Sequence, residues 1–139
     1  MNWLAWSLLS ALFAGVTAIL AKIGVEGVNS HLATAVRTGV VFIFAWLIVL
    51  GTGVGGGVFT FSRRTWIFLI LSGIATGLSW LCYFRALQLG EASKVAPIDK
   101  LSVIFVLGFA ALFLHEPLTW KTAAGCALIA GGAILLTLK

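Results

Sequence analysis

Five long apolar runs limit what this chain can fold into. They cover roughly Trp3–Val25, Leu32–Gly51, Trp66–Leu89, Val95–Leu114 and Leu118–Thr137. A helix of about 20 residues rises about 1.5 Å per residue and matches a hydrocarbon core of about 30 Å. The runs show no strand-like alternation, which excludes a membrane β-barrel. The pattern therefore predicts an all-α integral membrane protein with five transmembrane helices in a single domain, residues 1–139.

The composition agrees with a membrane protein and argues against a nucleic-acid partner. Hydrophobic residues make up 61% of the chain and charged residues 9%, whereas a soluble domain has about 25% charged residues. The net charge is +5, but the nine basic residues are scattered. Scattered basic residues are typical of membrane edges, so the predicted partner surface is the lipid bilayer.

The connections between the runs carry capping and turn signals. Ser30 and Ser62 precede the second and third runs, and each is a predicted helix cap. The longest connection, 51–64, is rich in glycine. We expect it to be a mobile loop at the membrane interface.

Four charged residues lie about one turn or more inside the ends of the predicted helices. Arg37 lies in the second, Arg85 near the end of the third, and Asp99 and Lys100 in the fourth. A polar group at membrane depth is costly unless function requires it, so these four residues are candidate substrate-binding residues. The alternative is that the long Arg and Lys side chains reach back to the interface.

Asp99 and Lys100 are neighbours in the sequence. On a continuous helix they would point about 100° apart, so we expect them not to pair and to find other partners. Arg37 and Arg85 are candidates for Asp99. Because Asp99 is the one acidic residue predicted within membrane depth, it is also the candidate proton-coupling residue.

Small and aromatic residues mark two further features. Trp80 and Tyr83 share a helical face and could line a binding pocket, although ordinary aromatic packing is the favoured alternative. Four-residue stripes of small residues predict close helix packing, but they do not indicate which chain supplies the partner helix. The stripes contain Gly15, Gly73, Gly77, Ala127 and Gly131.

Enzyme chemistry has no visible basis in this sequence. There is no paired nucleophile and base, no phosphate-binding glycine motif, and no His/Cys cluster with metal-ligand spacing. The two cysteines, Cys82 and Cys126, lie within apolar runs. We therefore expect no catalytic activity, no metal and no cofactor.

Several short motifs together resemble one known family. The run Tyr83-Phe84-x-Ala86-Leu87, the segment Glu91–Pro97, the exit Glu116-Pro117-Leu118-Thr119 and the glycine-rich last run resemble the EamA domain of the drug/metabolite transporter superfamily. Arg37 matches a position where this family often has arginine. The family's helix-four proline is absent from Leu101-Ser102-Val103, which removes the kink expected there.

The resemblance implies a transporter built from repeats. Typical members carry two such domains as inverted repeats, with the substrate cavity between them, and this chain looks like one repeat. The related small multidrug resistance proteins use a glutamate in their first helix, and the first run here has no acidic residue. A lone repeat would rebuild the cavity with a second copy of itself.

The basic residues bear on how two copies would pair. If Arg37, Arg85 and Lys100 belong to the helix bundle, three basic residues remain on each side: Arg63, Arg64 and Lys121 against Lys22, Lys94 and Lys139. This balance removes the positive-inside bias and favours an antiparallel, dual-topology homodimer. A parallel dimer and a heterodimer with a similar half-size chain are the alternatives.

The expected function is therefore secondary transport. The chain would export a small metabolite or drug-like solute from a prokaryotic inner membrane by alternating access. A non-transporting membrane subunit and a lipid-linked sugar flippase are the alternatives.

Overall fold

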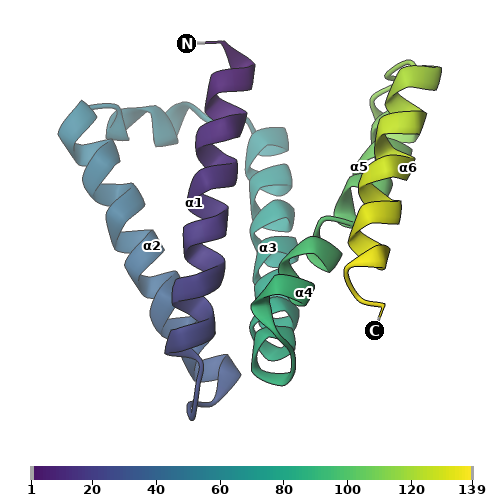
Figure 1. Ribbon diagram of the computed structural model, residues 1–139. Helices are drawn as coiled ribbons and strands as arrows, with labels where there is room; N and C mark the ends of the chain where they lie inside the picture. The colour runs from purple at the N-terminus through teal and green to yellow at the C-terminus, as the bar shows by residue number, and fades with distance from the viewer. Residues whose placement is uncertain (1, 139) are drawn as a thin grey trace. The chain divides into compact units, whose positions relative to one another are not determined.

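The computed structural model describes residues 2–138, and it is helical with no strand among these residues. Figure 1 shows the elements in chain order. They are α1 (Trp3–Gly24), α2 (Ser30–Thr52), the 3₁₀ helix η1 (Gly55–Thr60), α3 (Arg63–Leu89), α4 (Ala92–Asp99), α5 (Ser102–Phe113) and α6 (Trp120–Leu135). The predicted all-α fold class is confirmed.

Four apolar segments among the described residues are long enough to cross a membrane. They are α1, α2, α3 and the combined stretch Ala92–Phe113, while α6 is a shorter apolar helix of 16 residues. Their large apolar side chains are mostly exposed. Exposure of this kind fits a protein whose solvent is lipid, so the chain is a multi-pass membrane protein of about five helices.

The ends of the helices test the predicted caps. Asn29 caps α2, since its side-chain oxygen accepts hydrogen bonds from the backbone N–H of His31 at 2.9 Å and Leu32 at 3.4 Å. The prediction of Ser30 as this cap was wrong, because Ser30 is already the first helical residue. The prediction for Ser62 is confirmed, since its hydroxyl accepts from the Thr65 N–H at 3.1 Å.

The glycine-rich connection is more regular than the sequence predicted. Gly53 ends α2 in the left-handed region, at φ 72°, where a side chain would be strained. The η1 helix follows at once. The connection thus consists of short links on either side of a 3₁₀ helix, and its mobility at the interface remains a prediction.

The fourth apolar run is interrupted despite the missing proline at 103. Pro97 lies inside α4, and because it has no N–H, the Ser93 carbonyl cannot accept its usual helical bond. The chain then tightens into bonds between residues three apart: Lys100 N–H to Pro97 O at 3.0 Å, Leu101 N–H to Ile98 O at 2.9 Å and Val103 N–H to Lys100 O at 3.0 Å. The expectation that no break occurs in this region was wrong.

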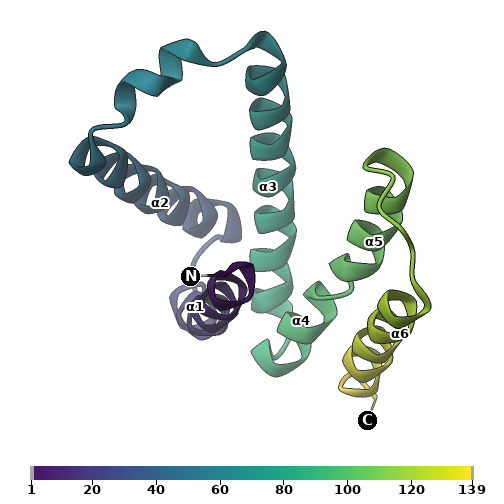
Figure 2. The ribbon, with the colours of Figure 1, turned by 90° about the horizontal axis from the view of Figure 1, so that it is seen from above.

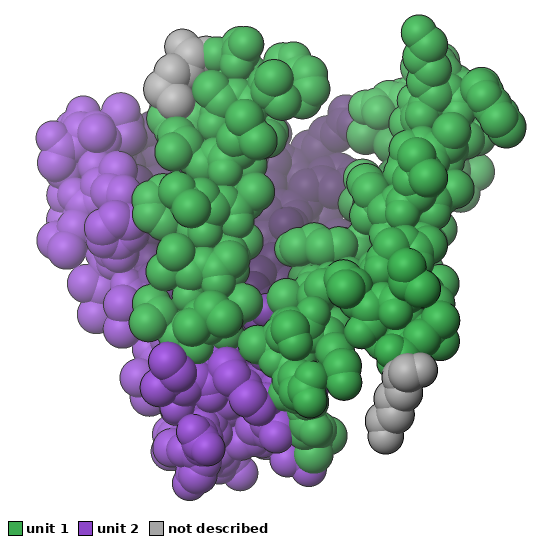
Figure 3. Space-filling view, in the orientation of Figure 1, with its two compact units in different colours: residues 1–20, 89–139 green, residues 21–88 purple. Residues whose placement is uncertain are grey.

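The chain divides into two compact units, coloured in Figure 3: residues 1–20 with 89–139, and residues 21–88. In the first unit, α6 contacts both α4 and α5, and Ala133 of α6 is buried. In the second unit, α2 and α3 come together where α2 starts and α3 ends. They separate toward η1, as Figures 1 and 2 both show.

Among the described residues, the small-residue stripes are not in close contact with another helix. A Cβ atom added at Gly15, Gly73, Gly77 or Gly131 would have no heavy atom within 4 Å, and Ala127 is exposed. Their role in helix packing remains a prediction, as does the chain that would supply the partner helix. Lys139, which entered the predicted charge balance, lies outside the described residues.

Candidate solute-binding site

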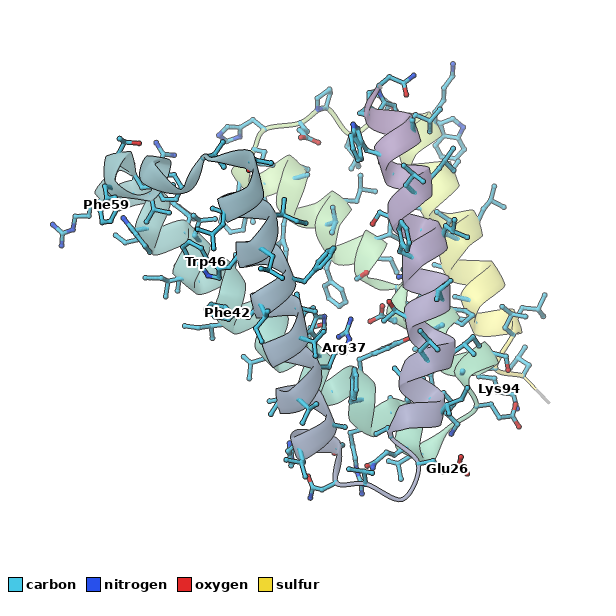
Figure 4. All side chains as sticks on the ribbon, turned by 90° about the vertical axis from the view of Figure 1, so that its left-hand side faces the viewer. Glu26, Arg37, Phe42, Trp46, Phe59 and Lys94 are labelled. Atoms are coloured by element: carbon cyan, nitrogen blue, oxygen red, sulfur yellow. The ribbon has the colours of Figure 1, made fainter. Side chains whose placement is uncertain are left out.

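Arg37 and two aromatic rings form the most distinctive polar cluster in residues 21–88. The guanidinium carbon of Arg37 lies 4.3 Å from the centroid of the Trp80 ring and 5.4 Å from that of Phe84. Figure 4 labels Arg37 on α2. Both distances are within the range of a cation–π interaction, which reaches about 6 Å.

Helix geometry explains how these side chains meet. Trp80 and Phe84 are four residues apart on α3, so they share one face of that helix. Arg37 lies seven residues after Ser30, about 10 Å along α2 at 1.5 Å per residue. The long Arg37 side chain reaches from α2 to the Trp80 and Phe84 rings of α3.

Arg37 forms no ion pair among the described residues. The two ion pairs found there join Lys94 to Glu91 at 3.1 Å and Lys100 to Asp99 at 3.5 Å. The aromatic rings interact with the Arg37 cation without neutralising it. A guanidinium has five N–H donors in a fixed planar fork, which matches a carboxylate or phosphate. Arg37 is therefore suited to bind the anionic group of a ligand.

Burial is graded across this cluster. Phe84 is buried, whereas Arg37, Trp80 and Tyr83 are half-buried. A half-buried guanidinium is still accessible to a ligand. Partial removal from solvent also lowers the local dielectric constant, which strengthens its attraction to an anion. The structure thus brings together Arg37 and Trp80 of the predicted site.

Arg85 has a different local role. Its Nη1 donates a hydrogen bond to the Gln88 side-chain oxygen at 3.0 Å. The Gln88 side-chain nitrogen in turn donates to the carbonyl of Val25 at 3.3 Å and to that of Val28. Arg85 therefore orients a glutamine that holds the turn between α1 and α2.

Lys22 makes a second tie at the same end of this unit. From the last turn of α1, its Nζ donates to the Leu87 carbonyl at 2.7 Å. Leu87 and Val25 are almost fully buried, at 0% and 1% exposure. The end of α3 is thus held against the α1–α2 turn by side-chain hydrogen bonds around a buried apolar layer.

Asp99 and Lys100 lie in the other compact unit. The expectation that these neighbours cannot pair was wrong, because Lys100 Nζ lies 3.5 Å from a carboxylate oxygen of Asp99. The helix ends at Asp99, with Lys100 as its capping residue, and the flexible lysine side chain folds back. Both side chains are largely exposed, at 40% for Asp99 and 59% for Lys100.

Three contributors were missed in the sequence. Phe84 could have been selected because it lies four residues after Trp80 on the same helix. Gln88 could have been selected because it is a polar residue in the last turn of an apolar helix. Lys22 has only the sequence signal of a basic residue at a membrane edge. No group of three or more His, Cys, Asp or Glu that could hold a metal occurs within residues 2–138.

Comparisons with known proteins identify the family. Residues 1–138 match the EamA-like transporter family. The chain is 51% identical to an uncharacterized transporter of a Sinorhizobium species, over 97% of this chain and 96% of the relative. It is 32% identical to the uncharacterized transporter YvbV of Bacillus subtilis, over 91% of this chain but 51% of that protein.

A more partial likeness carries a more specific name. Over 53% of this chain and 69% of the relative, the chain is 34% identical to an Enterobacter protein named a probable 4-amino-4-deoxy-L-arabinose-phosphoundecaprenol flippase subunit, ArnE. No solved structure matches the chain. The match along residues 1–138 and the relative of nearly equal length show that this chain belongs to the EamA-like transporter family.

Proposed function

We propose that this protein is a secondary transporter of a small solute with an anionic group, and that Arg37 binds that group. The observation that carries the proposal is the Arg37 cluster, a cation held over Trp80 and Phe84 without an ion pair in the described chain. The rings offer an apolar surface for the rest of the solute.

Charge in residues 21–88 supports an anion over a cation as the ligand. This unit contains Lys22, Arg37, Arg63, Arg64 and Arg85 but only one acidic residue, Glu26. A cationic drug would meet net repulsion there, whereas a carboxylate would be attracted. Tyr83 and Arg85, on the same stretch of α3, remain candidate binding residues in this proposal.

The second part of the proposal concerns assembly. The chain spans about half of YvbV, which is what one repeat of a two-repeat transporter would do. Inverted-repeat transporters bind substrate near the bilayer midplane, between the repeats. Two copies in opposite orientations in a prokaryotic inner membrane would restore that arrangement, with solute export by alternating access.

Asp99 and Lys100 keep their proposed roles in coupling and binding. Asp99 ends α4 where the spanning segment is interrupted, and interrupted helices hold coupling ions in several transporters. Asp99 is therefore the proposed proton carrier.

Ligand-dependent thermal stability tests the anionic specificity directly. Phenylacetate and phenethylamine are matched probes, with similar aromatic bodies and opposite charges. The purified wild-type protein should be stabilised by phenylacetate and not by phenethylamine, and Arg37→Gln should remove the effect. Stabilisation by the amine alone, or equal stabilisation by both, would contradict an anion site. Uptake of labelled phenylacetate into proteoliposomes then tests transport itself.

A lipid-linked sugar flippase is the second candidate, favoured by the likeness to ArnE. The substrate in that protein's name carries a phosphate on a polyprenyl chain. Arginine also binds phosphate well. Farnesyl phosphate and farnesol distinguish this function, since stabilisation by the phosphate alone, together with indifference to phenylacetate, would favour the flippase. A chain that responds to no probe and purifies only with a partner would favour a non-transporting subunit.

A further inference from the structure

Side-chain hydrogen bonds close one end of residues 21–88. Lys22 donates to the Leu87 carbonyl at 2.7 Å, and Gln88 donates to the carbonyls of Val25 and Val28. These contacts join the end of α3 to the α1–α2 turn, about sixty residues away along the chain. Among the described residues, no backbone–backbone hydrogen bond joins the end of α3 to this turn.

The carbonyl oxygens that accept these bonds could accept hydrogen bonds from water in place of the two side chains. The last carbonyls of a helix and those of a turn have no partner within a helix. If the side chains of Lys22 and Gln88 moved away, water would satisfy the same oxygens, and α3 would remain intact. The contact is therefore releasable without unfolding a helix.

An apolar layer lies beside these bonds. Val25, Phe84 and Leu87 are buried, with Ser30 and Thr34 of the first turns of α2. The Thr34 hydroxyl donates to the Ser30 carbonyl at 2.8 Å, and no fully buried side-chain polar atom among the described residues lacks a partner. Most other apolar side chains of α2 and α3 are exposed. Water is thus excluded at this end of the unit.

Phe84 connects the closed end to the ligand site. It belongs to the buried layer, and its ring centroid lies 5.4 Å from the Arg37 guanidinium carbon. Movement of the end of α3 would therefore displace one wall of the Arg37 cluster. Phe84 is thus shared by the buried layer and the Arg37 cluster.

We propose that Gln88 and Lys22 form a releasable gate that closes this end of the Arg37 site, with Arg85 as the positioning residue that orients Gln88. The proposal rests on the transport function proposed above, because a gate requires a solute to admit. When the gate opens, the donors leave the Leu87, Val25 and Val28 carbonyls and water enters the layer. No covalent step is involved.

Thiol labelling tests the gate without any solute. Ser30→Cys is nearly isosteric and places a reporter in the buried layer, in a full-length Cys82→Ala, Cys126→Ala background in detergent. We expect a charged methanethiosulfonate reagent to react at least tenfold faster when Gln88→Glu is added. This change keeps the side-chain size but removes the donor. Lys22→Met should act similarly, whereas Lys121→Met, an exposed lysine, should have no effect.

Amide hydrogen exchange separates gate opening from loss of the fold. Faster exchange confined to residues 25–34 and 84–89, with α6 unchanged, supports the gate. Unchanged labelling and exchange in Gln88→Glu would overturn it, and so would faster exchange throughout the chain, including α6. Arg85→Leu should give an intermediate labelling rate if its role is to position Gln88. Because no solute is used, a failed gate and a failed transport proposal give different results.

Discussion

Arg37 and Trp80 face each other across α2 and α3, with the guanidinium carbon 4.3 Å from the ring centroid. This contact holds a permanent cation among apolar helices without a carboxylate. A cation–π interaction stabilises such a charge through the negative face of the ring. The N–H donors at the edge of the guanidinium remain suited to an incoming anion, which gives the first two predictions.

Arg37→Gln should weaken binding of phenylacetate roughly 10- to 100-fold, because a hydrogen bond with a charged group contributes about 1.5–3 kcal/mol. The measurement is the concentration dependence of thermal stabilisation. Arg64→Gln is the matched control, since Arg64 also lies over an aromatic ring, that of Phe68 at 5.8 Å, but within one helix. Equal losses in both variants would show that net charge, rather than the Arg37 site, attracts the ligand.

Trp80→Leu should weaken the same binding by roughly 2- to 30-fold, since a cation–π contact contributes about 0.5–2 kcal/mol and also orients the arginine. Trp46→Leu is the control, because Trp46 lies against Phe42 on α2 and is 41% exposed. The titration used for Arg37 applies here. Unaltered affinity in Trp80→Leu would remove this ring from the site.

Leu87→Ala should destabilise the protein by about 2 kcal/mol. The cost comes mainly from the cavity, because transfer of an apolar side chain into lipid provides little hydrophobic drive. Leu87 is fully buried, whereas Leu89 is 73% exposed, so Leu89→Ala should change stability by less than about 0.5 kcal/mol. Thermal or denaturant unfolding of the two variants in one detergent makes the comparison. Similar losses would show that the end of α3 is not a packed layer.

Asp99→Asn should abolish the proton dependence of transport while leaving the thermal midpoint nearly unchanged. The small effect on stability is expected because the Asp99–Lys100 pair is exposed, and exposed pairs contribute about 0–1 kcal/mol. Uptake into proteoliposomes with and without an imposed pH gradient measures the coupling. Glu91→Gln serves as control, since Glu91 pairs with Lys94 in an exposed position. Proton-driven transport that survives in Asp99→Asn would assign coupling elsewhere.

Single cysteines between Gly51 and Gly57 should react from both sides of the membrane if the chain adopts two orientations. The background lacks Cys82 and Cys126, and cross-linking should join copies of opposite orientation. The physical basis is the balanced distribution of basic residues outside the bundle. Reaction from one side alone would replace the antiparallel homodimer with a parallel dimer or a heterodimer.

The sequence by itself determined the class of the protein and most of its elements. Apolar runs of about 20 residues have few stable solutions in lipid, so the helices and the membrane setting followed from composition and length. The arginine at 37 and the tryptophan at 80 could be selected because a polar or amphipathic side chain inside such runs is costly. The short sequence motifs also indicated the EamA-like transporter family.

Only the tertiary structure decided which polar groups meet. Phe84 beneath Arg37 and Lys22 on the Leu87 carbonyl join residues distant in the chain, and a helical repeat does not encode such pairs. The Asp99–Lys100 pair lies at a helix end that the apolar run did not predict. Local periodicity specifies the face of a helix, whereas the packing of separate helices determines what that face contacts.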